Sequence, residues 1–177
     1  MRRSTRVPGT GGTISFAVLA LAAMTVSSVM PGSAMAKARP PAAARAPEFA
    51  RARETARNRV IVTDFARLFY TERNVRTAFA RYVAPDYIQH NAGMVDGRDA
   101  AVAALAPMFA APGSRFAIKR ILVDGDMAAI HLHGRGGAEG RGATVVDLYR
   151  LSHGKIVEHW DVLQPIDAQT VNPHPYF

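Results

Sequence analysis

The spacing of apolar residues in the first part of this chain is typical of a helix. Between residues 48 and 70, side chains such as Ile61, Phe65 and Phe69 recur at intervals of three and four, which places an apolar stripe on one face. We therefore expect one long amphipathic helix over this segment.

Two shorter helices are expected to follow. Asn74 is a residue type that caps helix N-termini, and the apolar positions after it keep the helical spacing until Pro85 stops the helix. A short extended segment comes next. The third helix is expected through residues 100–109, with Pro107 bending or ending it.

After residue 113 apolar residues recur at every second position, which is the period of a strand. Gly154 can adopt the positive φ that a tight turn before the last strand needs. Helices first and a meander of strands afterwards predict an α+β domain. Its three N-terminal helices should pack on a curved antiparallel or mixed sheet whose mouth forms a cone-shaped pocket. The four predicted strands are residues 116–123, 127–134, 143–151 and 156–163.

The N-terminal residues have the pattern of an export signal. Arg2 and Arg3 precede an uncharged stretch over residues 14–29, and Ala34-Met35-Ala36 has the small-x-small pattern of a cleavage site. We expect residues 1–36 to be a signal peptide, so that the protein is secreted or periplasmic by the general or the twin-arginine route. A retained membrane anchor is the alternative, although the stretch is short for a bilayer about 30 Å thick.

Charge is distributed unevenly along the chain. The net charge is +8, yet residues 60–177 hold twelve basic and twelve acidic residues. Residues 37–47 are rich in Pro, Ala and Arg and have no large apolar side chain, so we expect a linker there and a folded domain over residues 48–177. A neutral domain does not favour nucleic-acid binding, and the absence of cysteine excludes disulfides.

One aspartate occupies a position where charged residues are uncommon. Asp147 shares a strand face with large, mostly apolar side chains, including Tyr149 and Leu151. A carboxyl group in such surroundings is suited to proton transfer near neutral pH, so we predict that Asp147 faces the pocket as a general acid or base. In the alternative, Asp147 forms a structural ion pair or caps a neighbouring backbone. The candidate partners are Arg135, Arg150 and Lys155.

Two histidines lie two residues apart on the preceding strand. Because side chains alternate across a strand, His131 and His133 share one face, and we expect that face to be the one that carries Asp147. Two imidazoles and a carboxylate are also plausible ligands for zinc or iron. Hydrogen bonding explains these residues equally well, and we expect that no metal or other cofactor is needed.

Three segments of the chain resemble a known family. They are residues 86–91 (DYIQHN), the turn at residues 123–126 and, above all, residues 145–164 (VVDLYRLSHGKIVEHWDVLQ). On these segments, residues 60–165 resemble the SnoaL-like polyketide cyclase family, within the nuclear-transport-factor-2-like superfamily that also contains ketosteroid isomerases. The resemblance implies an α+β cone, an aspartate acting as general acid or base, and polar partners two residues apart on the adjacent strand. These catalytic roles fall on Asp147, His131 and His133.

Further polar and aromatic residues are candidates for substrate binding. His90 and Asn91 end the short extended segment, where they either reach the mouth of the pocket or close a turn. On the last strand His159 and Asp161 share one face and Trp160 lies on the other, so only one of these sets lines the pocket. The sequence does not decide between them. We favour Trp160 as a pocket wall because of its large apolar surface, and a place in the core is the alternative. The expected substrate-binding residues are His90, Asn91, Tyr149, His159, Trp160 and Asp161.

These features together predict an exported protein that binds a small hydrophobic carbonyl compound. The expected chemistry is a cofactor-independent aldol-type cyclisation or isomerisation. In it, Asp147 takes a proton from the carbon beside the carbonyl and a histidine hydrogen-bonds the enolate oxygen. A ligand-binding protein of the same fold without catalysis is the alternative. We expect no nucleic-acid partner and no membrane contact beyond the signal, and a homodimer is compatible with the sequence.

Overall fold

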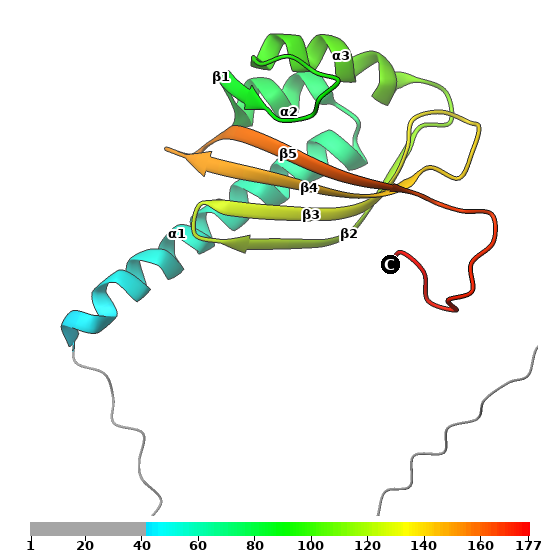
Figure 1. Ribbon diagram of the computed structural model, residues 1–177. Coiled ribbons are helices and arrows are strands. Elements are labelled where there is room, and N and C mark those ends of the chain that lie inside the picture. Colours follow the sequence, from blue (N-terminus) through cyan, green and yellow to red (C-terminus); the bar gives the residue numbers. More distant parts are fainter. Residues whose placement is uncertain (1–41) are drawn as a thin grey trace, which may run out of the picture. The chain divides into compact units, whose positions relative to one another are not determined.

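The computed structural model describes residues 42–177, with side chains from residue 46 onward (Figure 1). The predicted signal peptide, residues 1–36, lies outside the described residues. Within residues 42–177, no helix is both long enough and apolar enough to cross a membrane. The helices are α1 (Ala42–Ala66), which continues into a wider π-helical turn (Arg67–Thr71), α2 (Val75–Tyr82) and α3 (Arg98–Ala110). The strands are β1 (Val83–Gln89), β2 (Arg115–Asp124), β3 (Met127–Arg135), β4 (Ala143–Ser152) and β5 (Lys155–Pro165).

The five strands form one curved, mixed sheet in the order β1-β5-β4-β3-β2. Strands β2 to β5 pair antiparallel, whereas β1 runs parallel to β5 at the edge. The three helices cover one face of this sheet (Figure 1). The predicted fold class is therefore confirmed. The expected extended segment after α2 is the edge strand β1, where Pro85 is tolerated because an edge residue needs no ladder partner on its outer side.

Aromatic side chains from the helices and the inner face of the sheet form the core. Phe65 contacts Tyr149 of β4 edge to face, with ring centroids 5.4 Å apart. Phe69 stacks on Phe109 of α3 at 4.4 Å. These rings are all at least 95% buried, and such contacts hold the helices at a defined distance from the sheet.

Two local predictions are confirmed. Asn74 caps α2, because its side chain accepts a hydrogen bond from the backbone N–H of Thr77 at 3.2 Å. Gly154 has φ +77°, and His153 before it is also at positive φ, as a tight turn between β4 and β5 requires.

Two helix boundaries differ from the predictions. Helix α1 begins at Ala42 instead of residue 48, so residues 42–47 of the expected linker are helical. Ala is the best helix former, and the helix continues through Pro47, whose missing N–H removes one helical hydrogen bond in the second turn. Helix α3 continues beyond Pro107 to Ala110.

A bulge near the start of β5 decides which of its residues face the helices. The neighbours Arg150 and Leu151 of β4 pair with Glu158 and Ile156, which leaves Val157 as an extra residue. The bulge shifts the alternation by one position. Ile156 therefore faces inward before the bulge, and the odd-numbered residues face inward after it.

Candidate active site

A cavity of about 330 Å³ lies between the helices and the inner face of the sheet. This size suits a small organic molecule. Most of the wall is apolar. The polar side chains lie mainly on β4 and β5, with others on β1 and at the end of the first helix. The apolar wall includes Phe69, Phe79, Phe109, Phe116, Leu132 and Val145.

Asp147 lies in this cavity wall, only 8% exposed. Its Oδ2 accepts a hydrogen bond from the hydroxyl of Tyr70 at 2.6 Å, and that hydroxyl lies 2.6 Å from the hydroxyl of Tyr149. Because Tyr70 gives its single proton to Asp147, Tyr149 donates to Tyr70. Burial, followed by the nearby carboxylate, raises the pKa of both tyrosines well above the usual value. Both hydroxyls therefore stay protonated as donors.

Asp147 does not form the structural ion pair that the sequence left open. In the described part of the chain, Arg150 pairs with Glu158. Lys155 donates to the backbone carbonyl of Arg81, and Arg135 donates to that of Gly113. No permanently charged cation is bonded to Asp147 within these residues.

The second carboxylate oxygen of Asp147 meets a histidine. His159 of β5 is 7% exposed, and its Nε2 lies 3.0 Å from Asp147 Oδ1. Its Nδ1 lies 2.8 Å from Oε1 of Gln89, the last residue of β1. The parallel pairing of β1 with β5 brings Gln89 beside His159, so the imidazole is held at both nitrogens.

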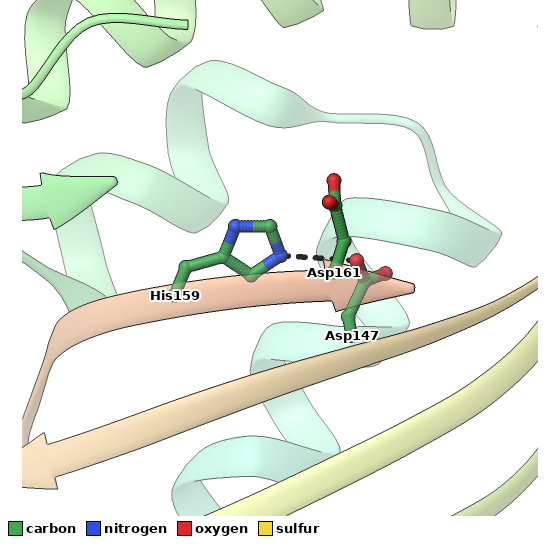
Figure 2. Close-up of side chains that lie close together, drawn as sticks. All are labelled: Asp147, His159 and Asp161. Atoms are coloured by element: carbon green, nitrogen blue, oxygen red, sulfur yellow. Dashed lines mark hydrogen bonds and ion pairs between the residues drawn. The ribbon is translucent and has the colours of Figure 1, made fainter. Parts of the chain in front are cut away.

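Asp161 lines the cavity two residues further along β5. Its Oδ2 accepts a hydrogen bond of 2.5 Å from Nδ2 of Asn91, which lies just beyond the end of β1. Figure 2 shows Asp147, His159 and Asp161 on the same side of β4 and β5. One donor or acceptor atom from each of the three lies within 4.8 Å of those of the others.

One imidazole and two carboxylates are also ligand types that zinc or iron accepts. This set, Asp147, His159 and Asp161, differs from the one considered from sequence, which used His131 and His133. Here each of the three residues is hydrogen-bonded to a protein group. That no metal is needed remains a prediction.

His131 and His133 do not meet Asp147, and that expectation is wrong. In the register of β3 and β4, Ile130 is opposite Asp147, so Ile130 shares the inner face and the two histidines point to the outer face. His131 Nε2 is hydrogen-bonded to Thr144 at 2.8 Å, and His133 Nε2 donates to a backbone carbonyl at 2.7 Å. Both rings lie 5.5 Å from the ring of Phe177 in the C-terminal segment.

Trp160 and His90 lie outside the cavity as well. Their rings stack in parallel, with centroids 4.6 Å apart, and Nε2 of His90 lies 2.8 Å from Glu158 Oε1. Trp160 follows an inward-facing residue, so alternation places it on the outer face. The expectation that Trp160 forms a pocket wall is therefore wrong.

The structure thus divides the sequence-predicted residues into two groups. Asp147, Tyr149, His159 and Asp161 line the cavity, with Asn91 directly behind Asp161. Two members of the cluster were missed from sequence. Gln89 stands inside the DYIQHN motif beside two predicted residues, and Tyr70 ends the apolar stripe of the first helix, where its hydroxyl was the only signal. The residues that lie outside the cavity are His90, His131, His133 and Trp160.

A family model of the SnoaL-like domain matches residues 62–159, just over half of the chain. The chain belongs to the SnoaL-like family. The matched part of this SnoaL-like domain contains Tyr70, Gln89, Asp147 and His159. None of the curated proteins matches the chain.

Solved structures share the fold of this SnoaL-like domain. An NTF2-like protein of unknown function from Mesorhizobium loti is 24% identical, with a TM-score of 0.55 over 63% of this chain and 93% of that one. A proposed ketosteroid isomerase from Kribbella flavida is 16% identical, with a TM-score of 0.54 over 69% and 85%. A proposed SnoaL-like polyketide cyclase from Jannaschia sp. CCS1 is 20% identical, with a TM-score of 0.50 over 62% and 87%. At these identities the likeness shows the fold alone.

Proposed function

We propose that this SnoaL-like domain binds a small, largely apolar carbonyl compound and transfers a proton at the carbon beside its carbonyl group. The Asp147–His159 pair supplies the acid–base chemistry. The enol or enolate formed in this way then undergoes double-bond migration or aldol-type ring closure, without a cofactor.

The observation that carries this proposal is the partner of Asp147. A buried aspartate held by Arg or Lys forms a structural ion pair, and neither of its two groups gains or loses a proton near neutral pH. Asp147 instead contacts an imidazole at 3.0 Å inside a cavity. A histidine is a common general acid or base, so the pair can exchange a proton with a bound molecule.

The comparisons support the same class of reaction. The Jannaschia protein is a proposed polyketide cyclase and the Kribbella protein a proposed ketosteroid isomerase. Aldol-type cyclisation and ketosteroid isomerisation both begin with removal of a proton from the carbon beside a carbonyl group. In ketosteroid isomerase an aspartate is the base that removes it. A cavity of mostly apolar lining with one acid–base cluster suits that shared first step.

The proposal is tested with 2-tetralone, a small aromatic ketone whose protons beside the carbonyl exchange readily. Exchange for deuterium in D₂O is followed by NMR, and binding is measured with the fluorescent enol analogue 2-naphthol. We expect exchange above the buffer rate that Asp147→Asn abolishes. The control is Asp99→Asn, which removes an exposed carboxylate on α3. Binding of 2-naphthol without exchange by the wild-type protein would support the non-catalytic alternative.

We also propose that the protein is exported. The supporting pattern is the paired arginines, the uncharged stretch over residues 14–29 and the cleavage pattern at Ala34-Met35-Ala36.

A further inference from the structure

The hydrogen-bond donors around His159 define where its protons lie. Gln89 Oε1 accepts a hydrogen bond of 2.9 Å from the backbone N–H of Asn91. This contact identifies Oε1 as the oxygen of the amide. The same oxygen lies 2.8 Å from His159 Nδ1. An amide oxygen carries no hydrogen and can only accept, so Nδ1 of His159 carries a hydrogen and donates it to Gln89 Oε1.

A second proton must lie between His159 and Asp147. A neutral imidazole with its hydrogen on Nδ1 has only a lone pair on Nε2, and that atom lies 3.0 Å from Asp147 Oδ1. Two acceptors at this distance are stable only when one of them is protonated. Whichever atom holds the proton, Asp147 and His159 together are neutral, which suits an apolar cavity. The pair is therefore loaded with one transferable proton.

The contacts of Asp161 are those of a carboxylate that carries no proton. Asn91 Oδ1 accepts from the backbone N–H of Gly93 at 2.8 Å, so Nδ2 of Asn91 is the group that faces Asp161. It donates to Asp161 Oδ2 at 2.5 Å, which marks that oxygen as an acceptor. Oδ1 of Asp161 has no protein partner among the described residues. Asp161 thus offers the cavity a carboxylate with a free oxygen.

We propose that Asp161 is the general base of this site and that the Asp147–His159 pair is its general acid. This assignment rests on the proposed function and divides its two roles between residues whose polar atoms lie within 4.8 Å of one another. It moves the base away from Asp147, where the sequence placed it. An acid and a base this close can act on the two ends of one carbonyl group and its neighbouring carbon.

The bound ketone is converted to its enol in one balanced step. Asp161 takes the proton from the carbon beside the carbonyl, and the electron pair of that C–H bond forms the C=C bond. The π electrons of the C=O bond take the proton held between His159 and Asp147. The products are the neutral enol, a protonated Asp161 and an Asp147 carboxylate beside a neutral His159. Return of the Asp161 proton to carbon and of the enol proton to His159 restores the site.

The test compares Asp161→Asn with the wild-type protein and Asp99→Asn in the 2-tetralone exchange assay. The asparagine keeps a side-chain oxygen for the contact with Asn91 but removes the base. We expect exchange to fall roughly 100-fold to 10,000-fold, with unchanged affinity for 2-naphthol. Asp161→Glu, which restores a carboxylate, should recover part of the rate. Normal exchange by Asp161→Asn, together with loss in Asp147→Asn, would overturn the assignment and leave the proposed function intact.

A measurement without turnover tests the acid. Nitrogen-15 NMR of His159 in the wild-type protein should show a hydrogen on Nδ1 and a second, shared proton at Nε2, and the second should disappear in Asp147→Asn. If Nδ1 of His159 carries no hydrogen, the assignment is wrong, whatever the exchange rates of the variants. Absence of exchange by the wild-type protein would overturn both the assignment and the catalytic part of the proposed function.

Discussion

Nε2 of His159 lies 3.0 Å from Oδ1 of Asp147, although the two residues are not directly opposite each other in the sheet. The register of β4 and β5 pairs Asp147 with Asp161 and Tyr149 with His159, so the imidazole reaches diagonally across the two strands. This diagonal contact leaves the side chain of Asp161 free to face the cavity. The three polar groups therefore share one wall without competing for the same partner.

Asp147→Asn separates a chemical role of this residue from a structural one. The amide can still accept from Tyr70 and can donate to Nε2 of a neutral His159, so the melting temperature should be close to that of the wild-type protein. Proton exchange should nevertheless fall by roughly 100-fold to 10,000-fold. Asp147→Ala, which removes the acceptor of the Tyr70 hydroxyl and the partner of His159 Nε2, should cost about 1–3 kcal/mol of unfolding free energy. A destabilised Asp147→Asn protein with full activity would refute the acid–base role.

Substitution of both outer-face histidines should leave catalysis unchanged. His131 and His133 lie on the face of β3 opposite the cavity. The double variant His131→Asn, His133→Asn should therefore exchange 2-tetralone at the wild-type rate. A marked loss of rate without loss of stability would mean that these residues reach the ligand.

Filling the cavity should block binding. Val145→Phe adds a ring to the apolar wall, whereas Val146→Phe places the same ring on the outer face of the same strand. We expect the first variant to weaken 2-naphthol binding by more than about tenfold, equivalent to about 1.4 kcal/mol. The second should not change it. Equal effects of the two substitutions on the measured affinity would place the ligand elsewhere.

The buried tyrosines should make the protein sensitive to alkali. Burial raises the pKa of Tyr70 and Tyr149 in the folded state, while tyrosines in the unfolded chain ionise near pH 10. As the pH rises above that value, the unfolded state binds fewer protons than the folded state, so the free energy of unfolding decreases. Tyr149→Phe should reduce this slope by up to about 1.4 kcal/mol per pH unit. Urea denaturation across the alkaline range measures it, and an unchanged slope would contradict the prediction.

The mature protein is predicted to begin at Lys37 or close to it. The cleavage pattern Ala34-Met35-Ala36 directly precedes this residue. N-terminal sequencing of protein from the periplasm or the culture medium provides the measurement. Protein that retains Met1 in the membrane fraction would contradict export with cleavage.

The fold was accessible from sequence because its signals are local. Helical spacing through Phe65 and Phe69, the cap at Asn74 and the turn at Gly154 each depend on residues that are near neighbours in the chain. The apolar pattern predicts a start of α1 that is too late, because the alanines and Arg45 before residue 48 carry no apolar stripe. They form helix by intrinsic propensity, which the pattern of burial does not record.

The site residues could be predicted only in part from the sequence, because their positions depend on the register of the strands. Alternation shows that His131 and His133 share a face, but the pairing of Ile130 with Asp147 decides which face it is. The loop between β3 and β4 is long enough to allow either register. On β5 the bulge at Val157 brings both Ile156 and His159 inward, and an extra residue of this kind leaves no mark in the sequence pattern.

The place of β5 in the sheet has a consequence for how the protein is made. This strand follows all the other elements in sequence, yet it lies between β1 and β4 in space. The bond from Tyr70 to Asp147 spans 77 positions, and the contact between Gln89 and His159 spans 70. A ribosome synthesises β5 after every other element of the domain, so β1 waits unpaired until then. The binding site can therefore form only after β5 has been synthesised, and contacts of this sequence separation favour slow folding.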